Sequence, residues 1–116
     1  MTRVRRGEVW TVGGGPDYLG KPRPAVVLQD DRFDALASVT VCAFTTDPTD
    51  APLFRLPIAA SDRNGLAAPS RLMVDKITTV PLAKLGARIG RLDDQDLVRL
   101  NRAIVVFLGL AGASIE

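Results

Sequence analysis

Arg23 is the side chain with the clearest potential for chemistry, because it directly precedes a nearly continuous apolar run over residues 24–29. A rigid strand after the arginine would fix its stem and leave the guanidinium at the surface. Thr45 and Thr46 end a second apolar segment, over residues 39–44. A guanidinium and two hydroxyls on adjacent strands can hold a phosphodiester and stabilise a pentacoordinate phosphorane. Taken alone, these residues are explained more simply as a solvated arginine and two strand-end threonines.

The chain contains no histidine, which excludes histidine-pair and serine–histidine mechanisms. Its carboxylates fall mainly in predicted loops or at a helix start, where turn and capping roles explain them, and their spacing predicts no metal site. The single cysteine, Cys42, lies inside a strand pattern and is expected to be a buried structural thiol. We therefore expect neither a metal nor a cofactor.

The composition indicates one domain, spanning residues 1–116, because 47% of its residues are hydrophobic and can form a single core. No apolar run approaches the ~20 residues that cross a bilayer, and the N-terminus lacks the apolar core of a signal peptide. We therefore expect no membrane association and a cytoplasmic location. A net charge of +2 is too small to predict a nucleic-acid partner. The excess of arginine over lysine suits phosphate binding, but a GC-rich genome produces the same bias.

The apolar pattern predicts a mainly β chain that ends in a helix. Strands are expected over residues 8–12, 24–29, 39–44, 53–58, 72–75, 77–80 and 87–92, with a kink near 75–76. The run 24–29 predicts a central strand buried on both faces, whereas the alternation over 39–44 predicts a half-buried one. Pro57 indicates an edge strand. Short helical turns are expected within 30–37 and at 81–84, and a turn at 62–65.

Asp93 is expected to cap the C-terminal helix, with acidic residues in its first turn. Apolar residues recur at helical spacing and predict a core-facing stripe at positions 97, 100, 104, 107, 108 and 111. Val105, Val106 and Leu110 widen this apolar surface. Two explanations remain open for the wide surface: a helix seated deeply on the sheet, or a subunit interface.

Five segments, in this order, resemble the MazF/PemK family of toxin endoribonucleases. They are Arg6-Gly7-Glu8-Val9-Trp10, Arg23-Pro24-Ala25-Val26-Val27-Leu28, Ala43-Phe44-Thr45-Thr46, Asp75-Lys76-Ile77-Thr78-Thr79 and Ile89-Gly90-Arg91-Leu92, followed by an amphipathic helix. Each segment alone is a weak signal, but the ordered set covers residues 6–110.

The resemblance implies an SH3-like barrel of antiparallel strands with a C-terminal helix, the fold that this family shares with the gyrase poison CcdB. It implies a homodimer that cuts single-stranded RNA without a metal, by attack of the ribose 2′-hydroxyl on the adjacent phosphate. It also implies an acidic antitoxin protein as partner. Arg23 and Thr45 match the family's catalytic pair. The residues expected to bind RNA are Asp17, Lys21, Thr46, Asp75 and Lys76.

The sequence departs from the family pattern at three places. The loop after the first strand is short, and Asp17 and Tyr18 match only roughly the region where some relatives have an acidic base, so the general base stays unassigned. Lys76 and Thr78 stand where the family commonly has glutamine and arginine, which predicts an unusual cut-site sequence. Two alternatives remain: a CcdB-like gyrase poison, and a catalytically inactive interaction module on the same barrel.

Overall fold

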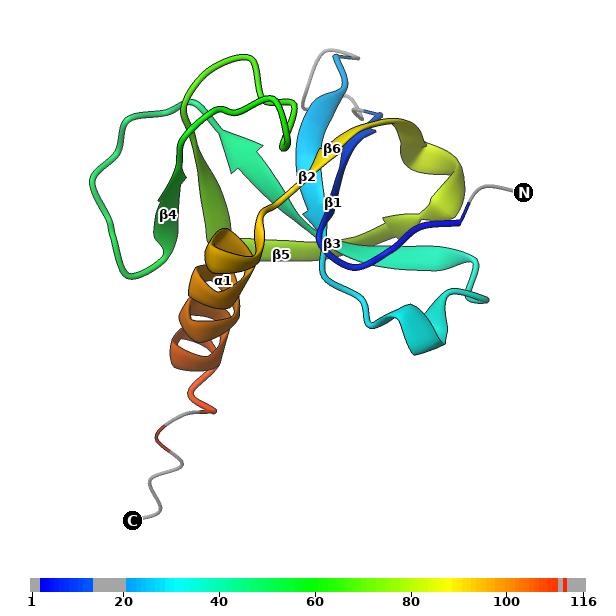
Figure 1. Cartoon of the computed structure of the whole chain (residues 1–116). Helices are drawn as coiled ribbons and strands as arrows, with labels where there is room; N and C mark the ends of the chain where they lie inside the picture. The colour runs from blue at the N-terminus through cyan, green and yellow to red at the C-terminus, as the bar shows by residue number, and fades with distance from the viewer. Residues whose placement is uncertain (1–2, 14–20, 111, 113–116) are drawn as a thin grey trace.

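A computed structural model describes residues 3–13, 21–110 and 112 (Figure 1). Its strands are β1 (Glu8–Val12), β2 (Arg23–Val27), β3 (Ser38–Thr45), β4 (Arg55–Ile58), β5 (Ser70–Pro81) and β6 (Leu85–Arg91). Two short 3-10 helices, η2 (Asp31–Phe33) and η3 (Leu82–Lys84), and one long helix, α1 (Asp94–Phe107), complete the fold. The strands form one sheet in the order β4-β5-β3-β2-β1-β6, with every neighbouring pair antiparallel. The predicted class, antiparallel strands followed by a C-terminal helix, is confirmed.

Apolar side chains form two clusters, one on each face of the sheet. The larger cluster lies between the sheet and α1 and is built around Val9, Val26, Cys42, Phe44, Leu56, Ile58, Leu66, Leu72, Val74, Leu92 and Leu100. The smaller cluster lies on the opposite face and contains Trp10, Ala25, Val27, Val39 and Val41. The two central strands, β2 and β3, therefore bury apolar side chains on both of their faces.

This arrangement confirms two predictions and corrects one. β2 is central and buried on both faces, as its continuous apolar run predicts, and β4, which contains Pro57, is an edge strand. The half-buried character predicted for residues 39–44 is wrong. Val41 is 2% exposed on one face and Cys42 0% on the other, because β3 lies between the two clusters.

β5 is one strand of 12 residues instead of two short ones, and it carries an irregularity where the kink is predicted. Cys42 pairs with Ile77, whereas Phe44 pairs with Leu72, so the residues around 73–76 bulge away from β3. This break lets the first part of β5 pair with β4 as well, with Met73 opposite Arg55.

α1 begins as predicted, because the Asp93 carboxylate accepts a hydrogen bond from the Asp96 N–H at 2.8 Å. The helix packs beside β4 and β5 (Figure 1), and its Leu100 side chain is fully buried. Replacing such a leucine by alanine typically costs about 2–5 kcal/mol. The predicted core stripe is wrong at its end, because Phe107 and Leu108 stay 46% and 56% exposed, although the Phe107 ring lies 6.3 Å from that of Phe54. The predicted stripe position 111 lies outside the described residues.

Gly7 explains the first motif of the sequence. It adopts a φ of +88°, which side-chain-bearing residues rarely tolerate. Its N–H donates to the Val27 carbonyl at 2.8 Å, and its carbonyl accepts from the Leu92 N–H at 2.9 Å. The neighbouring Arg6 guanidinium donates to the Leu28 carbonyl and to Asn101 of α1, at 2.8 and 2.6 Å. This segment therefore joins β2, the entry to α1 and the helix itself.

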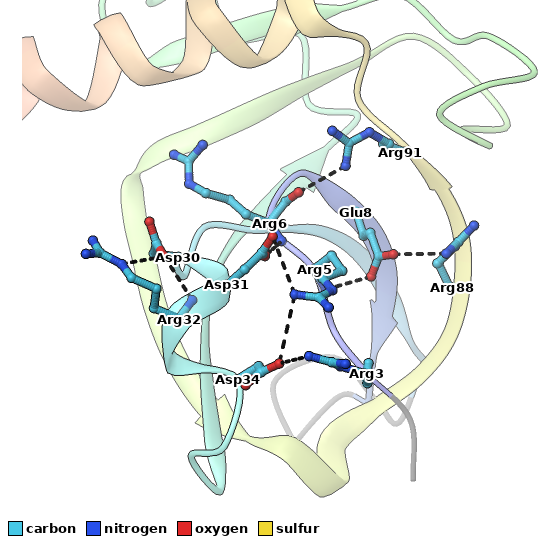
Figure 2. A network of polar contacts seen from close by, with 10 residues as sticks. All are labelled: Arg3, Arg5, Arg6, Glu8, Asp30, Asp31, Arg32, Asp34, Arg88 and Arg91. Atoms are coloured by element: carbon cyan, nitrogen blue, oxygen red, sulfur yellow. Dashed lines mark hydrogen bonds and ion pairs between the residues drawn. The ribbon is translucent and has the colours of Figure 1, made fainter.

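Glu8 lies next to this junction (Figure 2), and its residue surface is only 5% exposed. Its carboxylate accepts hydrogen bonds from the Arg5 N–H, the Trp10 indole N–H and the Arg88 guanidinium, at 2.8, 3.0 and 2.9 Å. A buried carboxylate needs such partners to be tolerated. Gly90 of the closing motif has a different role, because a Cβ there would lie 2.4 Å from the Arg63 carbonyl oxygen. Both motifs thus have structural explanations within the fold.

No helix in the described part of the chain is long and apolar enough to span a membrane.

Candidate functional site

The strand register brings Arg23 and Thr45 to one face of the sheet. Ala25 pairs with Ala43 across β2 and β3, and continuing that antiparallel register by two residues places Arg23 opposite Thr45. Residues opposite each other in an antiparallel pair project to the same face, with Cβ atoms about 4.5–5.5 Å apart. Arg23 is also exposed, and Thr45 partly so. The two residues predicted to form a catalytic pair are therefore neighbours in the sheet.

The Thr45 hydroxyl is oriented by a local turn. Its oxygen accepts a hydrogen bond from the Asp47 N–H at 3.1 Å. Because the hydroxyl oxygen is already an acceptor, its proton is the part that can be donated to a ligand. The side chain therefore presents a hydrogen-bond donor to the face that it shares with Arg23.

Arg71 extends this row, and sequence reasoning missed it. It pairs directly with Thr45 across β3 and β5, so two arginines flank one threonine on three adjacent strands. Its guanidinium donates to the Asp47 carbonyl at 3.3 Å, and among the described residues no carboxylate lies within ion-pair distance. We name Arg23, Thr45 and Arg71 the cationic row. The signal that could have identified Arg71 is the pairing of β5 with β3, which the sequence pattern does not specify.

Asp75 is committed to an ion pair instead of facing solvent alone. Its carboxylate accepts two hydrogen bonds from the Arg55 guanidinium, at 2.9 and 3.1 Å, and both side chains are mostly buried. These hydrogen bonds hold the pKa of Asp75 below its usual value and raise the pKa of Arg55. Lys76, next in the chain, is exposed. Of these two residues, both of which were expected to bind RNA, Lys76 is thus the more accessible one.

Two of the remaining predicted RNA-binding residues lie close to the cationic row along the chain. Lys21 and Thr46 are exposed, and Thr46 lines a shallow hollow with Pro57 and Arg71 at the far side of the row. Asp17 lies outside the described residues. The pKa of the nearby Asp47 carboxyl is lowered, first by hydrogen bonds from Thr49, so it stays ionised and accepts protons poorly at neutral pH.

Half of the arginines form ion pairs with carboxylates of the same chain. Within the described residues, ion pairs with carboxylates involve the six arginines 3, 5, 32, 55, 88 and 99. Figure 2 shows several of them gathered around Glu8 and the segment 30–34. η2, with Asp31 and Arg32, follows the end of β2, whereas Arg23 lies at its start. The arginines around Glu8 and the segment 30–34 therefore lie at the opposite end of β2 from Arg23.

A cavity of about 270 Å³ opens beside Arg23 on the same face of the sheet. Its lining includes Ala25, Ala43 and Lys84. A hydrogen bond of 2.7 Å from the Gly13 N–H to the Lys84 carbonyl holds η3 against the end of β1. No group of three or more carboxylate or thiol side chains that could hold a metal ion is present among the residues described.

Comparison with known proteins identifies the family of this chain. The family description "PemK-like, MazF-like toxin of type II toxin-antitoxin system" matches residues 5–108. A relative from Mycolicibacterium smegmatis, named "Probable endoribonuclease MazF", is 54% identical over 109 residues. That alignment covers 94% of this chain and all of the relative.

Solved structures share the fold. The Mycobacterium tuberculosis toxin MazF-mt6 matches with a TM-score of 0.74 at 27% identity, covering 88% of this chain and 96% of the toxin. A mycobacterial endoribonuclease solved in complex with its cognate antitoxin matches with a TM-score of 0.73 at 21% identity, covering 94% and 96%. The expected barrel architecture is thereby confirmed.

Proposed function

The chain belongs to the PemK-like, MazF-like family of toxins from type II toxin–antitoxin systems, and from this membership we propose that it is a sequence-selective endoribonuclease acting on single-stranded RNA. The assignment of its site is supported by the register of β2 and β3, in which Ala25 pairs with Ala43, because the same register continued by two residues would set Arg23 opposite Thr45. The name of the 54% identical relative favours RNA cleavage over gyrase poisoning.

The chemistry that suits this site is an intramolecular transesterification of the RNA backbone. The 2′-oxygen attacks the adjacent phosphorus, and the bond from phosphorus to the 5′-oxygen breaks. The products are a 2′,3′-cyclic phosphate and a 5′-hydroxyl, with the 2′-hydroxyl proton lost and one proton gained by the leaving oxygen. Arg23 would stabilise the negative charge of the phosphorane, and the Thr45 hydroxyl would donate to one of its oxygens. Neither role requires a metal or cofactor.

A homodimer is the expected assembly. Val106, Phe107, Leu108 and Leu110 at the end of α1 stay 46–65% exposed in the single chain. Several large apolar side chains in one exposed segment favour an interaction surface. Sedimentation at micromolar concentration should give the mass of two chains, and a single-chain mass would contradict the dimer.

An antitoxin is the expected protein partner, since a related endoribonuclease was solved with its cognate antitoxin. Lys21, Arg23 and Lys84 supply positive charge around the site, which suits an acidic segment that folds on binding. Such a segment would cover the cationic row and block RNA. We place this activity in the cytoplasm, where RNA substrates occur.

Cleavage of a long RNA, with the new ends mapped, tests the function. We expect cleavage in the presence of EDTA, a requirement for a 2′-hydroxyl at the cut, and 5′-hydroxyl ends. Arg23→Ala should lower the rate by about 100- to 1,000-fold, the usual loss for a preorganised charge-stabilising donor. Arg23→Lys should rescue poorly, because a point charge does not reproduce the planar fork.

Thr45→Val provides the shape-matched variant, and Thr40→Val provides its control. Thr40 lies on the same strand but bonds Thr79 on the other face, with 2.6 Å between the hydroxyl oxygens. Thr45→Val should lose activity while staying folded, whereas Thr40→Val should stay active. Cleavage of a substrate lacking the 2′-hydroxyl, or full activity of folded Arg23→Ala, would overturn the proposal.

A further inference from the structure

The end of β3 leads into a turn whose hydrogen bonds converge on one residue, Asp47. Its N–H donates to the Thr45 hydroxyl oxygen at 3.1 Å. Its carbonyl accepts from the Arg71 guanidinium at 3.3 Å. Its carboxylate accepts from both the N–H and the hydroxyl of Thr49, at 3.0 and 2.7 Å. Asp47 is therefore bonded to two residues of the cationic row through its backbone, and to the following turn through its side chain.

The Asp47 carboxylate fixes the shape of this turn. Its bond to the Thr49 N–H forms an Asx turn, in which an aspartate side chain bonds the backbone two residues further on. Pro48 lies between the two residues, and its ring fixes one backbone dihedral. Residues 46–50 are all exposed, so packing contributes little to the turn. The hydrogen bonds of Asp47 therefore hold the backbone that follows β3 in one conformation.

The rotamer of Thr45 depends on this turn. Threonine carries a hydroxyl and a methyl group on Cβ, and rotation about χ1 exchanges their positions. The hydrogen bond from the Asp47 N–H selects the rotamer that places the oxygen beside the turn. It also occupies an acceptor site of that oxygen, so the hydroxyl proton remains for a ligand. Without the turn, rotation about χ1 can put the methyl group where the hydrogen-bond donor now lies.

We propose that Asp47 is a positioning residue for RNA cleavage, because its carboxylate holds the turn that orients the Thr45 hydroxyl. The inference rests on the proposed function and adds to it a residue that does not itself touch the reacting atoms. The Asp47 carboxylate is bonded to Thr49, so its contribution reaches the phosphate only through Thr45. A reacting group misplaced by about 1 Å can lower the rate about 100-fold. Loss of the carboxylate therefore lowers kcat.

Asp47→Ala and Asp47→Asn separate the hydrogen bonds of the carboxylate from its charge. Both variants remove a negative charge near Arg55 and Arg71, but only asparagine keeps an oxygen that accepts from Thr49. In cleavage of a long RNA, Asp47→Ala should lower kcat by about 10- to 100-fold, whereas Asp47→Asn should stay within about 3-fold of wild type. An equal loss in both variants would show that Asp47 acts through its charge, as a general base does, and would overturn the inference.

Binding of uncleavable 2′-O-methyl RNA, followed by fluorescence anisotropy, distinguishes positioning from a loss of structure. Removal of a negative charge near the cationic row should leave the affinity of both variants unchanged or raise it, because RNA is itself an anion. Asp30→Ala is the matched control, since Asp30 bonds the Arg32 N–H at 2.9 Å in a similar turn beyond the other end of β2. Asp30→Ala should keep the kcat of wild type. Weaker RNA binding by Asp47→Ala, or an equal fall in kcat for Asp30→Ala, would overturn the inference.

Thr45→Val supplies the background in which Asp47 should no longer matter. If Asp47 acts through the Thr45 hydroxyl, Asp47→Ala should lower kcat in the wild-type chain and have almost no further effect in Thr45→Val. Losses that multiply in the double variant would overturn the inference.

The rotamer of Thr45 can also be measured without catalysis, from three-bond NMR couplings to its methyl carbon. We expect the couplings of a single χ1 rotamer in wild type and Asp47→Asn, and averaged couplings in Asp47→Ala. A wild-type chain that cuts no RNA would refute the proposed function, whereas the couplings show separately whether Asp47 orients the hydroxyl. Identical couplings in wild type and Asp47→Ala would overturn the inference even if RNA is cut.

Discussion

At the scale of single residues, Arg71 has the position of a phosphate-binding side chain, because it lies beside Thr45 on the strand opposite to that of Arg23. We expect Arg71→Gln to weaken the binding of uncleavable RNA similarly for all sequences. One lost phosphate contact should also reduce the slope of log affinity against log salt by about 0.7. Anisotropy titrations at several KCl concentrations measure both quantities.

Arg32→Gln is the matched control for this prediction. Arg32 is 80% exposed and paired with Asp30, and it lies beyond the opposite end of β2. The Arg32→Gln substitution removes the same charge far from the cationic row. Its slope of log affinity against log salt should therefore equal that of wild type. Equal slopes for Arg71→Gln and wild type would show that Arg71 touches no phosphate.

The residues of the site differ in how well the sequence predicts them. Arg23 and Thr45 could be identified because each lies at the end of a strand with a clear apolar pattern, and because the family resemblance assigns them roles. The pairing of Asp75 with Arg55 could not, since it depends on how β4 aligns with β5 across the long connection 59–69. The position of Arg71 could not be predicted for the same reason, because Arg71 lies beside Thr45 only through the register of β5 with β3.

At the scale of elements, β1 depends on the buried carboxylate of Glu8. Glu8→Ala would leave the Trp10 indole N–H without its acceptor and Arg88 without its partner. We expect a loss of about 1–3 kcal/mol in the free energy of unfolding, measured by urea denaturation. Glu8→Gln keeps an acceptor oxygen and the shape, so it should lose less. A Glu8→Ala stability within about 0.5 kcal/mol of wild type would contradict this role.

The Arg55–Asp75 pair should make the junction of β4 and β5 sensitive to acid. Its hydrogen bonds lower the pKa of Asp75 below 3.8 in the folded state, so the folded chain binds this proton less tightly than the unfolded chain. The pair therefore stabilises the fold fully above about pH 4, and the contribution disappears as the pH falls through the lower folded-state pKa. The Tm of wild type should therefore exceed that of Asp75→Asn above about pH 4, and this difference should shrink as the pH falls. For Asp62→Asn, at an exposed turn, the difference in Tm from wild type should not shrink in this way as the pH falls.

The elements themselves were mostly predictable, and the failures have common causes. Periodicity identified every strand region and the capped helix, because local patterns carry that information. It could not show that β3 is covered on both faces, since the second apolar cluster is assembled from distant strands. It also overestimated the buried length of α1, since helical spacing alone does not show how many turns of the helix the rest of the chain covers, and Phe107 stays 46% exposed.

At the scale of the whole molecule, Cys42 should report global unfolding. It is fully buried at the centre of the sheet, and burial, with a smaller contribution from the charge of Asp75, raises its pKa to about 12. The thiol therefore stays protonated at pH 8, and no reagent reaches it without opening the core. Labelling by a thiol reagent should therefore be very slow in buffer and rise with urea in parallel with the loss of structure. Rapid labelling of the native chain would show that β3 opens locally.

The alignment of the cationic row also has consequences for how this chain can change over evolutionary time. Arg23 and Thr45 meet because the number of residues between each of them and the paired alanines is the same on both strands. Inserting or deleting one residue inside β2 or β3 would send one partner to the other face of the sheet. Length changes should therefore accumulate among descendants of this gene in connections such as 46–54 and 59–69, while the strands of the row keep a constant length. A lineage that shifts this count by one loses the site at once, however well it preserves the amino acids.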